Sequence, residues 1–210
     1  MMISEVRKEV IRLYVALEFG EQLAHQCALQ QASWVENKKM QRFLQTQAKQ
    51  EYSHARFFSM AANNIQLKHQ YAPPVALKHF AARLEQSISK KDLVETMVGS
   101  QIVLEGFGEQ ILLRLNKGLD KNGIGFKKIR HTLLRQEQSH AAFGMHTLNT
   151  LIRNGEASVI QIAELTGEYL LYVNKITDEM SEMFHVLGED PKGYTSDIVN
   201  NLPMWLREKL

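Results

Sequence analysis

The sequence predicts an all-α protein built around a duplicated helical hairpin. The only prolines are at positions 73, 74, 191 and 203, so long stretches are free of helix breakers. In these stretches apolar residues recur every three to four positions, as in a helix with one buried face. One segment also occurs twice, as KQEYSHARF at 49–57 and as RQEQSHAAF at 135–143. No segment alternates in the manner of a strand, so helices alone are expected.

Five helices are expected, over residues 3–32, 33–63, 92–117, 126–153 and 158–187. The second helix is predicted to begin at Ser33, because Ser33-Trp34-Val35-Glu36 has the form of a capping box. The fourth is stopped by Asn154-Gly155 and the fifth by Gly188, since glycine readily takes the conformation that ends a helix.

The connections between these helices also have a predicted form. A long crossover over 65–91 contains Pro73-Pro74 and a short amphipathic piece at 76–88, and the sequence at 120–123 is typical of a turn. One domain over 1–210 is expected, with residues 1–153 forming a four-helix core. In that domain 158–187 is an additional helix and 188–210 an irregular tail.

The repeat extends to the helix that precedes each copy. Residues 17–22 read LEFGEQ and residues 104–110 read LEGFGEQ, so helix one pairs with two, and helix three with four. Counting along each antiparallel hairpin places the preceding glutamate and the Glu-x-x-His pair at similar heights. Within each pair the glutamate and the histidine share a helix face.

Four glutamates and two histidines are therefore expected to converge inside the bundle. Four carboxylates cannot be buried together without compensation, because burying even one unpaired charge costs several kcal/mol. Two divalent cations would balance them, and oxygen ligands with one imidazole per metal suit iron or manganese. The predicted metal ligands are Glu18, Glu51, His54, Glu105, Glu137 and His140.

These ligands make the sequence resemble the ferritin-like diiron carboxylate superfamily, over roughly residues 5–150. Within it, the layout is most similar to aldehyde-deformylating oxygenases and rubrerythrin-type proteins. The segment LEFGEQLA at 17–24 is similar to the first-helix ligand segment of the oxygenases. The resemblance implies a ferritin-like four-helix bundle with a long crossover, followed here by a fifth helix. It also implies two iron ions or a manganese–iron pair.

Several other residues allow more than one interpretation. Glu21 and Glu109 could be additional ligands, acceptors for the histidine imidazoles, or surface residues, and Tyr14 could bond a ligand or simply pack. A third Glu-x-x-His, ending at His185, lacks the flanking motif and is expected outside the site. Gln47 is a polar exception on an otherwise apolar face.

Three glycines fall near the predicted site. Gly106, Gly108 and Gly144 would either open space for a substrate or dioxygen, or allow helices to pack closely.

Charge and cysteine content restrict the partners. The net charge of +2 and the small basic clusters at 38–42 and 127–130 do not make nucleic acid an expected partner. Cys27 is the only cysteine, so no rubredoxin-type centre is built in, and an external ferredoxin or reductase is expected as electron donor. With no signal peptide and no long apolar run, a cytoplasmic location without membrane contact is expected. A homodimer is left open.

The expected function is that of a diiron oxidase or oxygenase that uses dioxygen to oxidise a small, partly apolar organic substrate. One alternative is a rubrerythrin-like peroxidase or a ferroxidase, which handle peroxide or iron. Others are a tRNA-modifying hydroxylase of the same fold and a binding module that has lost its metal. The long crossover and fifth helix fit a storage cage poorly, and the two basic clusters should lie at opposite ends of the bundle.

Overall fold

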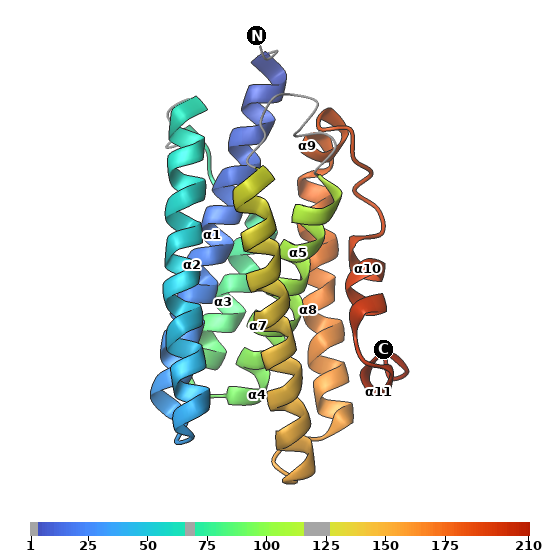
Figure 1. Cartoon of the computed structure of the whole chain (residues 1–210). Coiled ribbons are helices and arrows are strands. Elements are labelled where there is room, and N and C mark those ends of the chain that lie inside the picture. The colour runs from blue at the N-terminus through green and yellow to red at the C-terminus, as the bar shows by residue number, and fades with distance from the viewer. Residues whose placement is uncertain (1–3, 66–69, 116–126) are drawn as a thin grey trace.

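Two helical hairpins form the core of the bundle (Figure 1). The computed structural model describes residues 4–65, 70–115 and 127–210. The first hairpin pairs α1 (Ser4–Trp34) with α2 (Lys38–Ile65). The second pairs α7 (Lys127–Arg153) with a composite helix, which consists of α4 (Leu93–Thr96), η2 (Met97–Leu104) and α5 (Glu105–Arg114). No described residue belongs to a strand, and the predicted all-α fold is confirmed.

The remaining helices cover the side of the bundle away from α2 and α7. The crossover forms α3 (Val75–Ser89), which contacts α1 and α8 (Val159–Glu179). The predicted fifth helix is interrupted at Met180, after which α9 (Ser181–Val186) begins. The tail is not irregular, because it contains α10 (Tyr194–Asn201) and α11 (Met204–Arg207), which lie beside α8 in Figure 1.

Most predicted helix ends are observed. Asp92 caps α4 by accepting a hydrogen bond from the backbone N–H of Glu95 at 2.9 Å, and Ser158 caps α8 in the same way. Gly155 and Gly188 have φ angles of 73° and 76°, as expected of residues that end helices. The turn predicted at 120–123 lies outside the described residues.

The start of the second helix was predicted wrongly. Ser33 lies in the last turn of α1, and its hydroxyl donates to the carbonyl oxygen of Gln30 at 2.7 Å. The residue that caps α2 is Asn37, whose side-chain oxygen accepts from the backbone N–H groups of Lys39 and Met40 at 2.9 and 3.2 Å. The turn between α1 and α2 is therefore centred near residue 36.

The composite helix contains a π-helical segment that the sequence did not predict. In η2 the backbone winds more widely, and the N–H of Glu105 bonds to the carbonyl oxygen of Ser100, five residues earlier. A π-turn adds a residue to the helix and so changes which side chains face the core. The segment also lies close to α7, because a Cβ built on Gly144 would be 2.5 Å from the Cβ of Gln101. Gly144 thus serves close packing.

The sequence predicted no apolar run long enough to cross a membrane, and the observed helices can be checked for one. Among the described residues, no helix combines the length and the apolar content that a membrane span requires.

Candidate metal centre

Six ionisable side chains from four helices meet near the middle of the bundle. They form two overlapping groups, in each of which the candidate ligand atoms lie within 4.8 Å of one another. Glu51 and Glu137 belong to both groups, as carboxylates that bridge two metals would. The first group is Glu21, Glu51, His54 and Glu137, and the second is Glu51, Glu105, Glu137 and His140. Five of the six residues chosen from the sequence are thus brought together, although metal binding by them stays a prediction.

The sixth member is Glu21 and not Glu18. Glu18 is only half-buried, and its carboxylate accepts a hydrogen bond from Gln22 at 3.3 Å. The misplaced turn explains the difference. Counted from residue 36, Glu21 lies 15 positions earlier and Glu51 lies 15 positions later, so these two carboxylates are level. With a turn at Ser33, Glu18 lies 15 positions before the turn and Glu51 lies 18 after it, so Glu18 would be nearer in height to Glu51 than Glu21 is.

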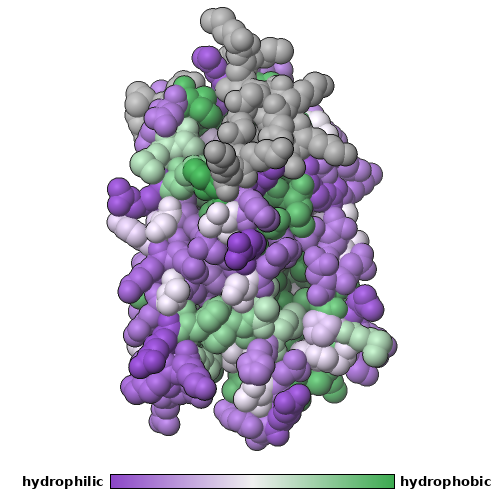
Figure 2. All heavy atoms as spheres, in the orientation of Figure 1, coloured by the Kyte–Doolittle hydropathy of each residue, from purple (hydrophilic) through white to green (hydrophobic). Residues whose placement is uncertain are grey.

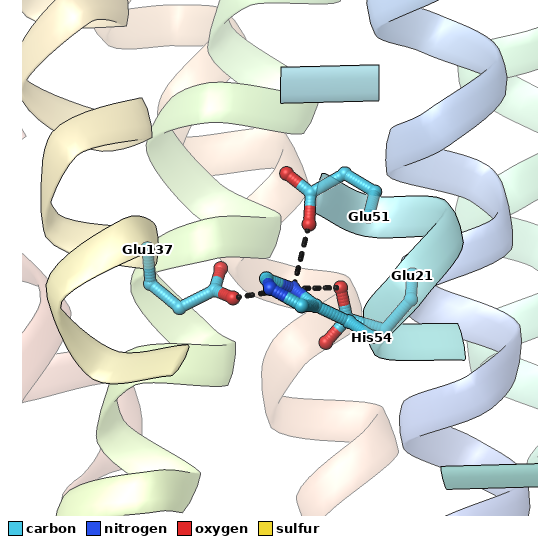
Figure 3. Close-up of side chains that lie close together, drawn as sticks. All are labelled: Glu21, Glu51, His54 and Glu137. Carbon is cyan, nitrogen blue, oxygen red and sulfur yellow. Dashed lines mark hydrogen bonds and ion pairs between the residues drawn. The ribbon is translucent and has the colours of Figure 1, made fainter. Parts of the chain in front are cut away.

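Three carboxylates converge on one nitrogen of His54 (Figure 3). The Nδ1 atom of His54 is 3.0 Å from Glu51 Oε2, 3.3 Å from Glu21 Oε2 and 3.3 Å from Glu137 Oε1. One ring nitrogen carries at most one proton, so it cannot donate a hydrogen bond to three acceptors at once. The arrangement supplies more lone pairs than protons, as a cation site does.

The second group has a comparable arrangement around His140. Its Nδ1 atom is 2.8 Å from Glu51 Oε1 and 3.6 Å from Glu105 Oε2. Glu51 therefore faces both histidines, with a different carboxylate oxygen toward each of them.

These atoms are buried and lack aligned hydrogen bonds. Glu51 is 0% exposed and His140 is 1% exposed. Both oxygens of Glu51, Oε1 of Glu137 and Nδ1 of His140 make no hydrogen bond of acceptable geometry, despite the short distances between them. Buried polar atoms without hydrogen bonds are rare in native proteins, and a bound metal ion would account for these. This donor set fits two divalent cations of the iron or manganese type.

Without metal, the charged form of two of the carboxylates is disfavoured. Burial, followed by repulsion from Glu137, raises the pKa of Glu21 well above its ordinary value. Burial and the charges of Glu51 and Glu137 do the same to the pKa of Glu105. Without cations, the cluster would therefore retain protons that a free carboxyl group loses.

For the other two shifted groups of the cluster, Glu51 and His54, the change in pKa favours the charged form. Burial opposes the charge of Glu51, but the imidazoles of His140 and His54, at 2.8 and 3.0 Å, outweigh it and lower the pKa of Glu51. Burial likewise disfavours charge on His54, but contacts with Glu137 and the other carboxylates raise the pKa of His54. A divalent cation would take over the role that the imidazolium proton has in the metal-free protein.

A chain of buried glutamines holds Glu105 from behind. Gln47 donates from Nε2 to Glu105 Oε1 at 2.8 Å, and Gln101 donates to Gln47 Oε1 at 3.3 Å. Gln31 and Gln101 exchange two further hydrogen bonds, at 3.1 and 2.7 Å. This glutamine chain donates a hydrogen bond to Oε1 of Glu105, and Oε2 of Glu105 faces His140. This role of Gln47 was not predicted from the sequence, where its polar side chain on an otherwise apolar face was the available signal.

The other candidates lie outside both groups. Glu109 accepts a hydrogen bond from the exposed Gln138 at 2.9 Å. The buried ring of Tyr14 packs on Phe58, with 6.0 Å between centroids, and burial raises the pKa of Tyr14, which keeps its phenol neutral. His185 is exposed on α9, away from the cluster, as expected.

A mostly apolar cavity adjoins the cluster. Its volume is about 50 Å³, several times the roughly 10–15 Å³ that one water needs. Gly108 lies on the wall, and a Cβ there would meet nothing within 4 Å, so this glycine does leave room. The lining residues come from α1, α3, η2, α5, α7, α8 and the residue that follows α8: Leu13, Ala16, Leu17, Gly20, Glu21, Ala24, Leu77, Leu104, Glu105, Phe107, Gly108, Ile111, Glu137, Ile176 and Met180.

Comparison with known proteins supports the fold. No family model matches the chain, and no curated protein matches it in sequence. A solved structure does match: a protein with aldehyde deformylating oxidase activity from Synechococcus, with a TM-score of 0.79. The match covers 99% of this chain and 90% of that chain, at 15% sequence identity. The chain therefore has the fold of a ferritin-like helical bundle.

Proposed function

We propose that the protein is a diiron oxidase or oxygenase, which uses dioxygen to oxidise a small, partly apolar organic molecule. The observation that carries the proposal is the junction of the donor set and the apolar cavity. Glu21, Glu105 and Glu137 belong to the cluster and also line the cavity. A molecule held there would lie beside the metals in a chamber that is largely apolar, which iron storage does not require. The activity of the Synechococcus protein is consistent with this proposal.

The residues of the chain have distinct roles in this proposal. Glu51 and Glu137, which belong to both groups, would help to hold both irons, and His54 and His140 would each hold one through Nδ1. Bound iron(II) would supply electrons to dioxygen. The apolar wall would orient the substrate and keep bulk water away from the reacting centre.

Glu21 and Glu105 differ in their freedom to move. Glu105 is tied by Gln47, whereas the position equivalent to Gln47 in the second repeat is Leu133, which offers no hydrogen bond. The Glu21 side chain keeps 12% of its surface exposed and faces the cavity. Glu21 is thus the carboxylate best placed to shift when a substrate enters.

The electron donor is proposed to be an acidic protein that approaches α2 and α7. The only acids of these two helices are Glu51 and Glu137, which are both buried. The exposed charges of α2 are all positive, and Figure 2 shows this face to be largely hydrophilic. Complementary charge speeds the encounter of proteins, so rising ionic strength should slow reduction by an acidic ferredoxin. The exposed cations are Lys38, Lys39, Arg42, Lys49 and Arg56 on α2, with Arg135 and Arg153 on α7.

Anaerobic titration with iron(II), followed by oxygen, tests the proposal. Saturation near two irons per chain is expected, with oxygen consumption that short-chain aldehydes or related apolar compounds accelerate. Uptake of tens or hundreds of irons would favour storage instead, and rapid turnover of hydrogen peroxide without an organic substrate would favour a peroxidase. A chain that binds no metal would contradict the proposal.

A cavity variant tests the substrate part separately. Gly108→Met should fill the cavity while leaving all six donors in place, so iron binding should persist and acceleration by the organic compound should be lost. Gly167→Met makes the same change on α8, outside the cavity lining, and should retain both properties. Equal acceleration in the two variants would show that the cavity does not hold the substrate.

A further inference from the structure

The two repeats share a glutamine before each Glu-x-x-His, and each glutamine contacts the histidine of the other repeat. Gln136 Oε1 on α7 lies 2.9 Å from His54 Nε2 on α2. Gln50 Oε1 on α2 lies 2.9 Å from His140 Nε2 on α7. Both hydrogen bonds thus cross from one helix to the other, and the two distances are the same.

The chemistry of these bonds determines where the imidazole proton lies. A carboxamide oxygen only accepts hydrogen bonds, so the ring must donate its Nε2–H to the glutamine. A neutral imidazole has one N–H, and Nδ1 is then left with a free lone pair. In both His54 and His140, Nδ1 is the atom that faces the carboxylate cluster. Each glutamine therefore selects the tautomer in which Nδ1 can bind a metal.

The bonds also span a place where the two helices are separated. A cavity of about 410 Å³ opens between α2 and α7, and Gln50 and Gln136 both line it, together with Phe43 and Arg135. The glutamines are half-buried at this cavity, whereas the histidines behind them are buried. The crossed hydrogen bonds hold the outer edge of each imidazole ring across this separation.

We propose that Gln50 and Gln136 are positioning residues, each of which orients the metal-binding histidine of the opposite repeat. The proposal rests on the proposed function, because it takes the cluster as a two-metal centre. It explains why the duplicated motif begins with glutamine. It also predicts a crossed dependence: removing Gln50 impairs the group that contains His140, and leaves His54, on the same helix as Gln50, in place.

Cobalt(II) binding under anaerobic conditions measures the effect without relying on activity. Wild-type protein should bind two cobalt ions per chain. Gln50→Leu and Gln136→Leu should each weaken one of the two sites by about 10–100-fold, the usual effect of losing a partner of a metal-binding histidine. Gln50→Glu keeps an acceptor and should bind both ions. Gln138→Leu is a matched control, because this exposed α7 glutamine bonds Glu109 and contacts neither histidine.

Proton NMR of the cobalt-loaded protein identifies which histidine responds. Each bound imidazole contributes one strongly shifted N–H signal that exchanges with water, and His54→Ala and His140→Ala assign the two signals. Gln50→Leu should accelerate exchange of the His140 signal alone, and Gln136→Leu that of the His54 signal alone.

The outcomes separate this inference from the proposed function. If wild-type protein binds neither cobalt nor iron, the proposed function fails. If wild-type protein binds two metals and the leucine variants match it in affinity and exchange, the positioning role is refuted while the function stands. A change in the histidine of the same helix would overturn the crossed arrangement. Should one leucine variant not fold, the other tests the crossing on its own.

Discussion

Replacing Gly144 by alanine should destabilise the bundle, although alanine is the better helix former. Gly144 lies inside α7, where a glycine-to-alanine change by itself gains about 1 kcal/mol. The added Cβ, however, would lie 2.5 Å from the Cβ of Gln101 and 3.2 Å from Cδ1 of Ile102. The end of the Ile102 side chain can rotate away. The Cβ of Gln101 cannot, because it is attached directly to the backbone of η2.

The size of the effect follows from these two contributions. Forcing a methyl group into a packed core typically costs about 1–3 kcal/mol. Gly108→Ala is the matched control, since its Cβ would meet nothing within 4 Å and only the helix preference remains. The free energy of unfolding of Gly144→Ala should thus be about 1–3 kcal/mol lower than that of Gly108→Ala.

Equilibrium unfolding in urea, with metal-free protein and both variants, measures this difference. The slope of the free energy of unfolding against urea concentration should be the same in both variants, because the surface exposed on unfolding hardly changes. Gly144→Ala should also weaken cobalt binding, because a displaced Gln101 loosens the Gln47–Glu105 hydrogen bond. Equal stability of the two variants would refute the close approach of α7 to η2.

Three further predictions concern the cluster. Glu21→Gln should lower iron binding, whereas Glu18→Gln, outside both groups, should leave the stoichiometry measured by anaerobic titration unchanged; the reverse result would restore the assignment made from sequence. His185→Ala should leave iron content as in the wild type, and a loss equal to that of His54→Ala would place α9 in the site. Because the folded state raises the pKa of Glu21, Glu105 and His54, folded protein binds more protons than unfolded protein near neutral pH, and the metal-free form should lose stability as pH rises between about 6 and 8. Divalent metal replaces those protons, so the gain in melting temperature on adding metal should grow over the same range, and a constant gain would contradict the linkage.

Local patterns in the sequence were sufficient to predict the helices and most of the cluster. Periodicity and the placement of proline and glycine identify helices because both act within a few residues of the chain. The repeated Glu-x-x-His identifies Glu51, His54, Glu137 and His140, since i and i+3 always share a helix face. Glu105 followed from the repeat, and the structure brings all five together.

The choice between Glu18 and Glu21 depended on one turn. Both lie on α1, one helical turn apart, and both are glutamates in an apolar stretch. Which of them meets Glu51 is determined by where α2 begins: the sequence pattern indicated a start at Ser33, whereas in the structure Asn37 caps the helix. Moving the turn by three residues changes the position on α1 that is level with Glu51 by six residues, or about 9 Å, which is enough to exchange the two carboxylates.

By itself the sequence determined that two Glu-x-x-His helices and two further carboxylate helices form a bundle, because helix formation and helix faces are local properties. Only the tertiary structure decided how the helices meet. The glutamine chain from Gln31 and the crossed contacts of Gln50 and Gln136 join residues far apart in the chain. Such contacts depend on the relative height and rotation of packed helices. Side-chain packing across the whole bundle sets both, so neither follows from the sequence of a single helix.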